Sequence, residues 1–265
     1  MRNPSGSIQY VCLDPTGNLT CLVLDGTDPE SEKIITARLM GECEQVAYLE
    51  VPAASGSRAR IRLMGGEFCG NAAMAAACYL ASRDGLKDAA FPLEVSGAEK
   101  PVSCRARLSG DQWEGTVEMP RILGVTDIRF GGYDLTAVMM EGIRHLVLTE
   151  SIAEDREAEE LLRKAAETVP EEAVGLLQWN RETGAMRPLV LVKGSGTLVW
   201  ETGCGSGSAA IGAWEALRRG NGQTETAVHQ PGGVIRSRAA AENGRILSVS
   251  ITGKVSLGTE KSLEI

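Results

Sequence analysis

The chain reads EFCGNAA at residues 67–73 and ETGCGSGSA at residues 201–209, so one pattern occurs twice about half a chain apart. In each copy a cysteine, Cys69 or Cys204, stands directly before a glycine and a small polar residue. The alanine-rich stretch that follows is predicted to be a buried helix. Packing explains the alanines but not the cysteines, because Asn, Ser or Asp would cap a helix better. The pattern therefore predicts a functional pair of thiols, each at a helix N-terminus.

A helix N-terminus suits thiol chemistry for a physical reason. Its unpaired backbone N–H groups and partial positive charge stabilise a thiolate and can also hold a carboxylate. The glycines after the cysteines, Gly70 and Gly205, would let a ligand approach the backbone closely. If the two helix ends faced one another, one thiol could act as base and the other as acid. Such a site suits the inversion of a stereocentre.

The other five cysteines are interpreted as small buried hydrophobes. They are Cys12, Cys21, Cys43, Cys78 and Cys104. Seven cysteines are an odd number, and because no two are spaced as Cys-x-x-Cys, reduced thiols are favoured over a disulfide framework. The chain has only two histidines and no cluster with ligand spacing, so no metal site is predicted.

Composition limits the partners. With 265 residues and 43% hydrophobic content the chain can form one large domain or two ordinary ones. A formal net charge of −8 argues against nucleic acid or an acidic membrane surface as a partner. No apolar run approaches the roughly 20 residues of a membrane helix, and residues 1–6 lack the apolar core of a signal peptide. A cytoplasmic location is therefore expected, and a homodimer is an assembly that the sequence allows.

Periodicity and turn signals divide the chain into two halves built alike. Helices are expected at 28–41, 69–83, 154–169 and 206–219. Strands are expected within 7–25 and 45–64, near 91–96, 101–108, 113–119, 135–140, 143–149, 174–180, 187–192 and 197–200, and alternating with turns in 227–265. The order strands, helix, strands, cysteine helix, strands thus occurs twice, which is compatible with duplication.

The motifs resemble one family along almost the whole chain and in the right order. CGNA at 69–72 and CGSG at 204–207 resemble the two cysteine motifs of the diaminopimelate epimerase family. Further similar segments are Gly17-Asn18, GIRHLV at 142–147, QPGG at 230–233 and ITG at 251–253. The resemblance implies an α+β fold of two similar domains, each a curled, barrel-like antiparallel sheet around a central helix, with the site in the cleft between them. The expected domains are 1–122 with 253–265, carrying Cys69, and 123–252, carrying Cys204.

The resemblance also implies racemisation or epimerisation of an amino acid without pyridoxal phosphate or another cofactor. One cysteine, as thiolate, would remove the α-proton while the other, as thiol, delivers a proton to the opposite face. Backbone N–H groups in a dry cleft would hold the carboxylate and stabilise the developing carbanion. The donors expected from the matched motifs are Gly70, Asn71, Gly205 and Ser206, with the Asn71 side chain also in reach.

Four further residues receive roles from the resemblance. His145 matches the family's histidine and is expected to tune Cys69, the alternative being a satisfied core histidine. Glu201 is expected to serve Cys204, although the family usually places its glutamate further upstream. Asn18 lies in the matching opening loop and is expected to contact substrate. Glu44 is expected to read a cationic or N–H-bearing side chain, and a solvated turn acid is the alternative.

Departures from the family pattern concern the substrate. Diaminopimelate epimerases carry Cys-Gly-Asn-Gly-x-Arg at the first site and Glu-Arg-Gly before the second, whereas this chain has AAM at 72–74 and GSGT at 194–197. A second carboxylate would lack its arginine partner. The motifs are more similar to histidine racemases of staphylopine-like metallophore synthesis, so conversion of L-histidine to D-histidine is predicted. The alternatives are a diaminopimelate epimerase (LL to meso), a racemase of another amino acid, and a non-enzymatic amino-acid-binding module.

Overall fold

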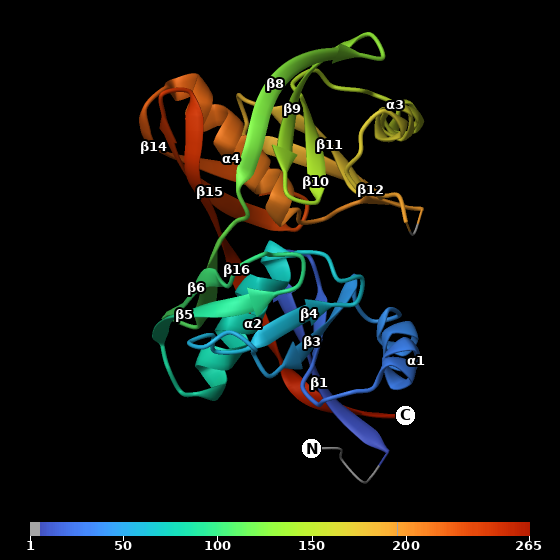
Figure 1. The fold of residues 1–265 in the computed structure, drawn as a ribbon, viewed down its shortest axis with the longest axis vertical. Helices are drawn as coiled ribbons and strands as arrows, with labels where there is room; N and C mark the ends of the chain where they lie inside the picture. The colour runs from blue at the N-terminus through green and yellow to red at the C-terminus, as the bar shows by residue number, and fades with distance from the viewer. Residues whose placement is uncertain (1–5, 195) are drawn as a thin grey trace. The chain divides into compact units, whose positions relative to one another are not determined.

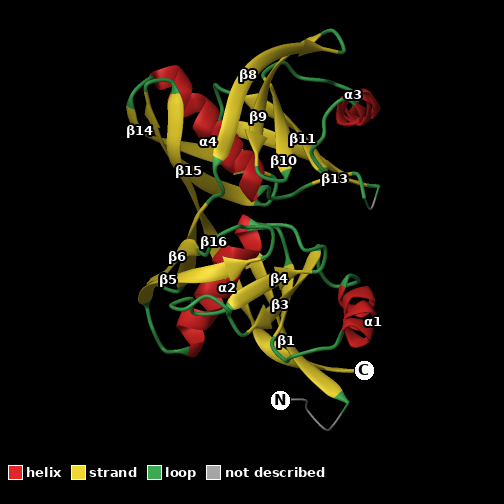
Figure 2. Ribbon diagram, in the orientation of Figure 1, coloured by secondary structure: helices red, strands yellow, loops and turns green. Residues whose placement is uncertain are grey.

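The computed structural model describes residues 6–194 and 196–265, which form two compact units. Unit 1 comprises residues 1–118 and 252–265, and unit 2 comprises residues 119–251. The described residues are mostly strand, with four helices (Figure 2). Residues 1–5, on which part of the signal-peptide argument rests, and Ser195 of the segment before the second cysteine lie outside the described residues.

Unit 1 contains seven strands of its own, two helices and part of a shared strand. Its elements are β1 (Ser7–Pro15), β2 (Thr20–Val23), α1 (Pro29–Leu39), β3 (Gln45–Glu50), β4 (Arg60–Leu63), α2 (Gly70–Arg83), β5 (Asp88–Val95), β6 (Val102–Ser109) and β7 (Gln112–Glu118). The shared strand is β16 (Arg245–Glu264), whose residues from 252 onward belong to unit 1.

Unit 2 has a similar order, with one additional strand before its first helix and one before its second. Its elements are β8 (Ile122–Phe130), β9 (Tyr133–Met140), β10 (Ile143–Leu148), α3 (Asp155–Glu167), β11 (Ala173–Asn180), β12 (Ala185–Val192), β13 (Thr197–Trp200), α4 (Gly205–Arg219), β14 (Gly222–Gln230) and β15 (Gly233–Glu242), followed by the first part of β16. Strand β8 was not predicted from the sequence. Four of its nine residues are exposed and the other five are partly buried, so the strand lacks a clear alternation of apolar and polar residues.

The strand pairings show the repeat directly. In unit 1 the pairs β1–β2, β3–β4 and β5–β6 are antiparallel, whereas β2–β3 and β4–β5 are parallel. Unit 2 has the same pattern in β9–β10, β11–β12 and β14–β15, with β10–β11 and β12–β14 parallel. The predicted antiparallel sheets are therefore wrong in this respect, since the sheets are mixed. A helix connects the two strands of each parallel pair, as parallel neighbours require a crossover.

The cysteine helices lie at the centre of their units. Helix α2 contacts β1, β2, β4, β5, β6 and β7, and its residues from Gly70 to Ala81 are buried. β16 pairs with β1 and is also the neighbour of β7, which closes the strands of unit 1 around this helix (Figure 1). Gly115 of β7 allows the close approach, because a Cβ there would lie 2.8 Å from the Cβ of Met74. Helix α4 contacts β8, β10, β11, β14 and β15 in the same way.

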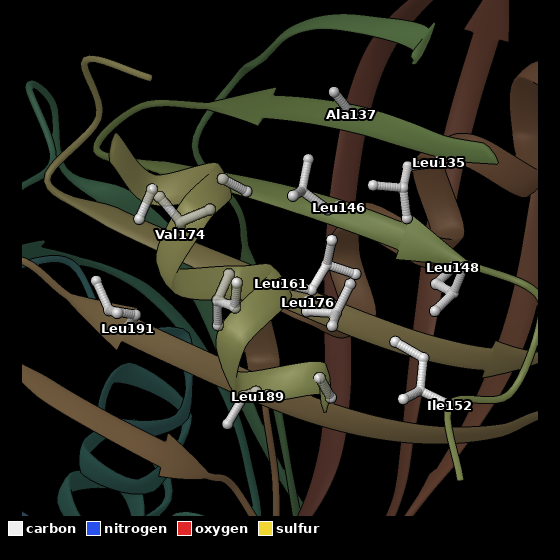
Figure 3. Close-up of a cluster of buried hydrophobic side chains, with 14 residues drawn as sticks. Leu135, Ala137, Leu146, Leu148, Ile152, Leu161, Val174, Leu176, Leu189 and Leu191 are labelled. Atoms are coloured by element: carbon white, nitrogen blue, oxygen red, sulfur yellow. The ribbon is translucent and has the colours of Figure 1, made fainter. Parts of the chain in front are cut away.

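The other two helices cover outer faces of the sheets. Figure 3 shows a buried cluster of unit 2 in which Leu161 of α3 packs with leucines of the sheet. Ile35 and Leu39 of α1 join a similar cluster in unit 1. Asp28 begins α1, since its side chain accepts the N–H groups of Glu30 and Ser31 at 3.1 Å. These layers leave α2 and α4 as the helices enclosed within the sheets.

Candidate functional site

Cys69 is the N-cap of α2. Its backbone is extended, with φ −132° and ψ 112°, and its Sγ accepts the N–H of Ala72 at 3.5 Å. The thiol is partly exposed, whereas Gly70 and Asn71 behind it are buried. A sulfur atom in this position receives the N–H dipoles of the first helical turn, which stabilise its anionic form.

The segment that carries Cys69 is held by the end of β5. The Ser96 hydroxyl donates to the Glu67 carbonyl at 2.8 Å and accepts the N–H of Leu63 at 2.9 Å. Gly97 has φ +74° and lies directly against the peptide between Glu67 and Phe68, where a Cβ would come closer than 3.0 Å. Ser96 and Gly97 were not predicted, because only the fold brings them to the cysteine segment.

Cys204 is the N-cap of α4 and repeats the geometry. Its Sγ accepts the N–H of Gly207 at 3.3 Å, the third residue after it, as Ala72 is after Cys69. Its backbone N–H donates to Gln230 Oε1 at 2.7 Å, and Gln230 Nε2 donates to the Ser208 hydroxyl at 2.9 Å. Gln230, which lies in the QPGG segment similar to the family, thus fixes the start of α4. Its role was not predicted from the sequence.

The electrostatic environment of Cys204 favours the thiol. Burial raises its pKa well above the ordinary value, and the charge and hydrogen bond of Glu201 raise it further. The Ser206 hydroxyl and the Gly207 N–H lower it by smaller amounts. Only 3% of Cys204 is exposed. Glu201 therefore raises the pKa of Cys204, and its role in catalysis stays a prediction.

His145 lies in β10 of unit 2 and is fully buried. Its Nε2 is 2.9 Å from the Ser206 hydroxyl, which in turn lies 3.6 Å from Cys204 Sγ. Burial lowers the pKa of His145 to about 3, so the ring is neutral. Its contacts are thus with the cysteine of its own unit, through Ser206. Its expected action on Cys69, which belongs to unit 1, stays a prediction.

Asn18 and Glu44 form one hydrogen-bonded cluster. Asn18 Nδ2 donates to the exposed Glu44 carboxylate at 2.8 Å, and Gln45 Nε2 donates to Asn18 Oδ1 at 2.6 Å and to Thr20 Oγ1 at 2.7 Å. The Asn18 amide orients this exposed carboxylate, and contact of Glu44 with the substrate stays a prediction. Gln45 was missed, and its place at the start of β3 was the available signal.

The strand order brings this cluster and the Cys69 segment to one edge of unit 1. Thr20 pairs with Gln45, so β2 and β3 begin together. Strand β4 runs antiparallel to β3 and ends at Leu63, whose backbone N–H donates to the Ser96 hydroxyl at 2.9 Å. The starts of β2 and β3 and the ends of β4 and β5 therefore share the edge at which Asn18, Glu44 and the Cys69 segment are found.

Neither a metal-binding cluster nor a disulfide occurs among the described residues. Within 6–194 and 196–265 no group of three or more His, Cys, Asp or Glu side chains could hold a metal ion. All seven cysteines fall in these ranges and are thiols. In the part of the chain that the structure describes, no helix is long and apolar enough to cross a membrane.

Comparison with known proteins identifies the family. A family model described as the histidine racemase CntK N-terminal domain matches residues 7–262, nearly the whole chain. The chain belongs to the histidine racemase family. The histidine racemase of Staphylococcus aureus strain Mu50 is 30% identical over 240 residues, which cover 86% of this chain and 87% of the relative. That of Fusobacterium nucleatum strain ATCC 25586 is 28% identical over 241 residues, covering 85% and 86%.

Solved structures share the fold at lower identity. A predicted epimerase from Pseudomonas aeruginosa superposes with a TM-score of 0.72 at 17% identity, covering 97% of this chain and 99% of that one. A hydroxyproline epimerase from Agrobacterium vitis, with bound trans-4-hydroxy-L-proline, has a TM-score of 0.69 at 14% identity, covering 100% and 94%. Membership of the histidine racemase family makes the chain an amino-acid racemase, an isomerase acting on a small molecule. The predicted family and enzyme class are confirmed.

Proposed function

We propose that this chain interconverts L-histidine and D-histidine, with Cys69 and Cys204 as the acid–base pair. The observation that carries the proposal is the family match over residues 7–262, which includes both cysteine-capped helices. The curated relatives are named histidine racemases and cover most of the chain. We also propose that the repeated units correspond to the diaminopimelate epimerase-like architecture.

In the proposed reaction the two sulfur atoms act on opposite faces of Cα. A thiolate removes the α-proton, and the other cysteine, as thiol, donates a proton to the opposite face. After this step the first cysteine is a thiol and the second is a thiolate. The reverse reaction starts from these states, so the two cysteines exchange roles. The high pKa of Cys204 supports its entering the first turnover as the thiol. Carbanion stabilisation is assigned to the first N–H groups of α2 and α4, at Gly70, Asn71, Gly205 and Ser206.

Substrate choice is assigned to the Asn18–Glu44 pair. The Glu44 carboxylate is exposed but oriented by Asn18, so it can accept a hydrogen bond from an imidazole N–H. Glu44→Gln keeps the shape and removes the charge. We expect it to raise the KM for histidine about tenfold, as the loss of a charge-assisted hydrogen bond would. Glu42→Gln, two residues earlier in the same exposed turn, is the matched control and should leave KM unchanged.

The decisive experiment is proton NMR of the reduced protein in D2O with L-histidine and, separately, D-histidine. The α-proton signal should disappear from both enantiomers as deuterium enters at Cα. Cys69→Ser and Cys204→Ser should each abolish the exchange, while Cys12→Ser, a partly exposed thiol on β1, should not. Exchange of diaminopimelate without histidine would overturn the substrate, and exchange that survives either active-site substitution would overturn the two-cysteine mechanism.

Assembly and location stay predictions. The homodimer is tested by the mass of the native protein in solution, and the cytoplasmic location by cell fractionation. Production of D-histidine for an opine metallophore is likewise a prediction, which a cell lacking this chain tests through loss of that product.

A further inference from the structure

Three polar groups of unit 2 lie in a row. His145 Nε2 is 2.9 Å from Ser206 Oγ, and Ser206 Oγ is 3.6 Å from Cys204 Sγ. The groups come from β10 and from the first turn of α4, so their spacing is set within one unit. The histidine does not reach the sulfur directly. Any effect it has on Cys204 passes through the serine hydroxyl.

The direction of these hydrogen bonds follows from the other ring nitrogen. His145 Nδ1 is buried and has no hydrogen-bond partner among the described residues. It lies against the backbone of Gly175, the residue paired with His145 on β11, where a Cβ would come closer than 3.0 Å. Since a buried N–H without an acceptor is rarer than a buried acceptor without a donor, the ring proton belongs on Nε2. Nε2–H then donates to Ser206 Oγ, and the serine proton is left to point at the sulfur.

We propose that His145 and Ser206 form a fixed hydrogen-bond relay that stabilises the thiolate of Cys204. The neutral imidazole donates to the serine hydroxyl, which donates to the thiolate alongside the N–H of Gly207. No proton is transferred along the relay, because each donor keeps its own. His145 is thus a positioning residue, and Ser206 is the group that touches the reacting atom.

The relay offsets an environment that otherwise opposes ionisation. Cys204 is buried, and Glu201, in the segment before α4, is the charged group that acts on it. In the thiol form the sulfur is hydrogen-bonded with Glu201, whereas in the thiolate form it can only accept. Ser206 and Gly207 supply donors for that second form. Glu201 therefore stabilises the thiol form of Cys204, and the donors of Ser206 and Gly207 stabilise the thiolate form. A residue that acts alternately as acid and base requires both forms to be stabilised.

The relay distinguishes Cys204 from Cys69. Ile143 pairs with Ala173 at the start of β11, as Thr20 pairs with Gln45 at the start of β3. Two residues further along, β10 has His145 and β2 has Leu22. The repeat therefore places a hydrocarbon in unit 1 where unit 2 has the imidazole. The two thiols are predicted to differ in their dependence on a buried histidine.

The catalytic consequence rests on the proposed function, whereas the pKa of Cys204 can be measured without substrate. The readout is the pH titration of thiolate ultraviolet absorbance, with the same protein carrying Cys204→Ser as the blank. Ser206→Ala and His145→Leu should each raise the pKa of Cys204 by about one unit, a roughly tenfold loss of thiolate at a fixed pH below that pKa. The double variant should match Ser206→Ala alone, because His145 acts only through the serine. His145→Gln keeps an N–H donor near the position of Nε2 and should restore most of the effect.

Two results would overturn the relay. One is a pKa of Cys204 that does not change in Ser206→Ala, a partly exposed position whose substitution leaves the core intact. The other is a double variant whose shift equals the sum of the single shifts. If His145→Leu does not fold, Ser206→Ala still decides. Histidine exchange in D2O separates the two proposals: Ser206→Ala should lower kcat with little change in KM, and a parent protein that exchanges no histidine would refute the proposed function while the titration still judges the relay.

Discussion

Replacing Gly97 by alanine tests whether the end of β5 positions Cys69. Gly97 has φ +74°, and its Cα lies against the Glu67–Phe68 peptide. An alanine there has two costs. The left-handed backbone conformation costs about 1–2 kcal/mol for a residue with a Cβ. The new methyl also collides with backbone atoms that can withdraw only if the cysteine segment moves, and overpacking of this kind costs about 1–3 kcal/mol.

Gly85 provides the matched control. It has φ +72° just beyond the end of α2, and a Cβ there would meet nothing within 4 Å. Gly85→Ala therefore carries the conformational cost alone, about 1–2 kcal/mol. Gly97→Ala should lower the free energy of unfolding in urea by about 2–5 kcal/mol. The difference between the two losses in unfolding free energy measures the cost of the collision between the new methyl group and the Glu67–Phe68 peptide.

Activity provides the second readout. To reach an ordinary contact distance the Phe68 nitrogen must withdraw by roughly 1 Å, and a misplacement of that size can lower a rate about a hundredfold. Histidine exchange by NMR in D2O should therefore fall strongly in Gly97→Ala and stay near the parent value in Gly85→Ala. Equal losses of stability in the two variants, together with full exchange in Gly97→Ala, would refute the positioning role.

Three further predictions concern unit 2, and urea unfolding tests each. Burial lowers the pKa of His145 to about 3, so its neutral form stabilises the fold fully above pH 6.5 and this contribution is lost as pH falls toward 3, by about 1.4 kcal/mol per unit. His145→Gln should remove this slope, and an unchanged slope would exclude the histidine as its source. Burial raises the pKa of Glu215, but the hydrogen bond and charge of Arg181 outweigh it and hold that pKa below 4.5. Because its stabilisation is present above pH 4.5 and lost as pH falls through the lower folded value, Glu215→Gln should cost about 1 kcal/mol at neutral pH, a modest figure since Arg181 is half exposed, and should reduce acid sensitivity. Equal acid sensitivity in parent and variant would contradict this assignment. Gly212→Ala should destabilise by about 1–3 kcal/mol despite better helix propensity, because its Cβ would collide with the buried Ser237 of β15, and a gain in stability would show that the contact can relax.

The helices and most strands could be predicted because their signals are local. The helix expected at 69–83 is observed at Gly70–Arg83, and the one expected at 206–219 at Gly205–Arg219. The strands and turns expected in 227–265 are observed up to residue 244, but β16 then continues without a turn for 20 residues. Gly258 in this strand lies against the Cys12 carbonyl, opposite the register shift in β1, so it marks a bulge and not a turn.

The site could be predicted only in part, for the same reason. The two cysteines and Glu201 stand in a short motif that carries its own chemistry. Gln230, Ser96 and Gly97 contact that motif from strands far along the chain, and no local pattern marks such contacts. His145 was assigned to Cys69 by resemblance alone, whereas its observed hydrogen bond leads to Cys204. The parallel pairing of strands likewise depends on long-range order and not on periodicity.

The shared strand β16 has a consequence for the order in which the protein is made. All of unit 2 lies between two pieces of unit 1, and the second piece starts at residue 252. Ser7 pairs with Glu264, so β1 leaves the ribosome long before the strand with which it pairs. Unit 2 has all its residues before unit 1 does, although it begins 118 residues later. During translation the Cys204 helix can therefore be enclosed while the Cys69 helix still lies in an open sheet, with its apolar surface accessible to chaperones.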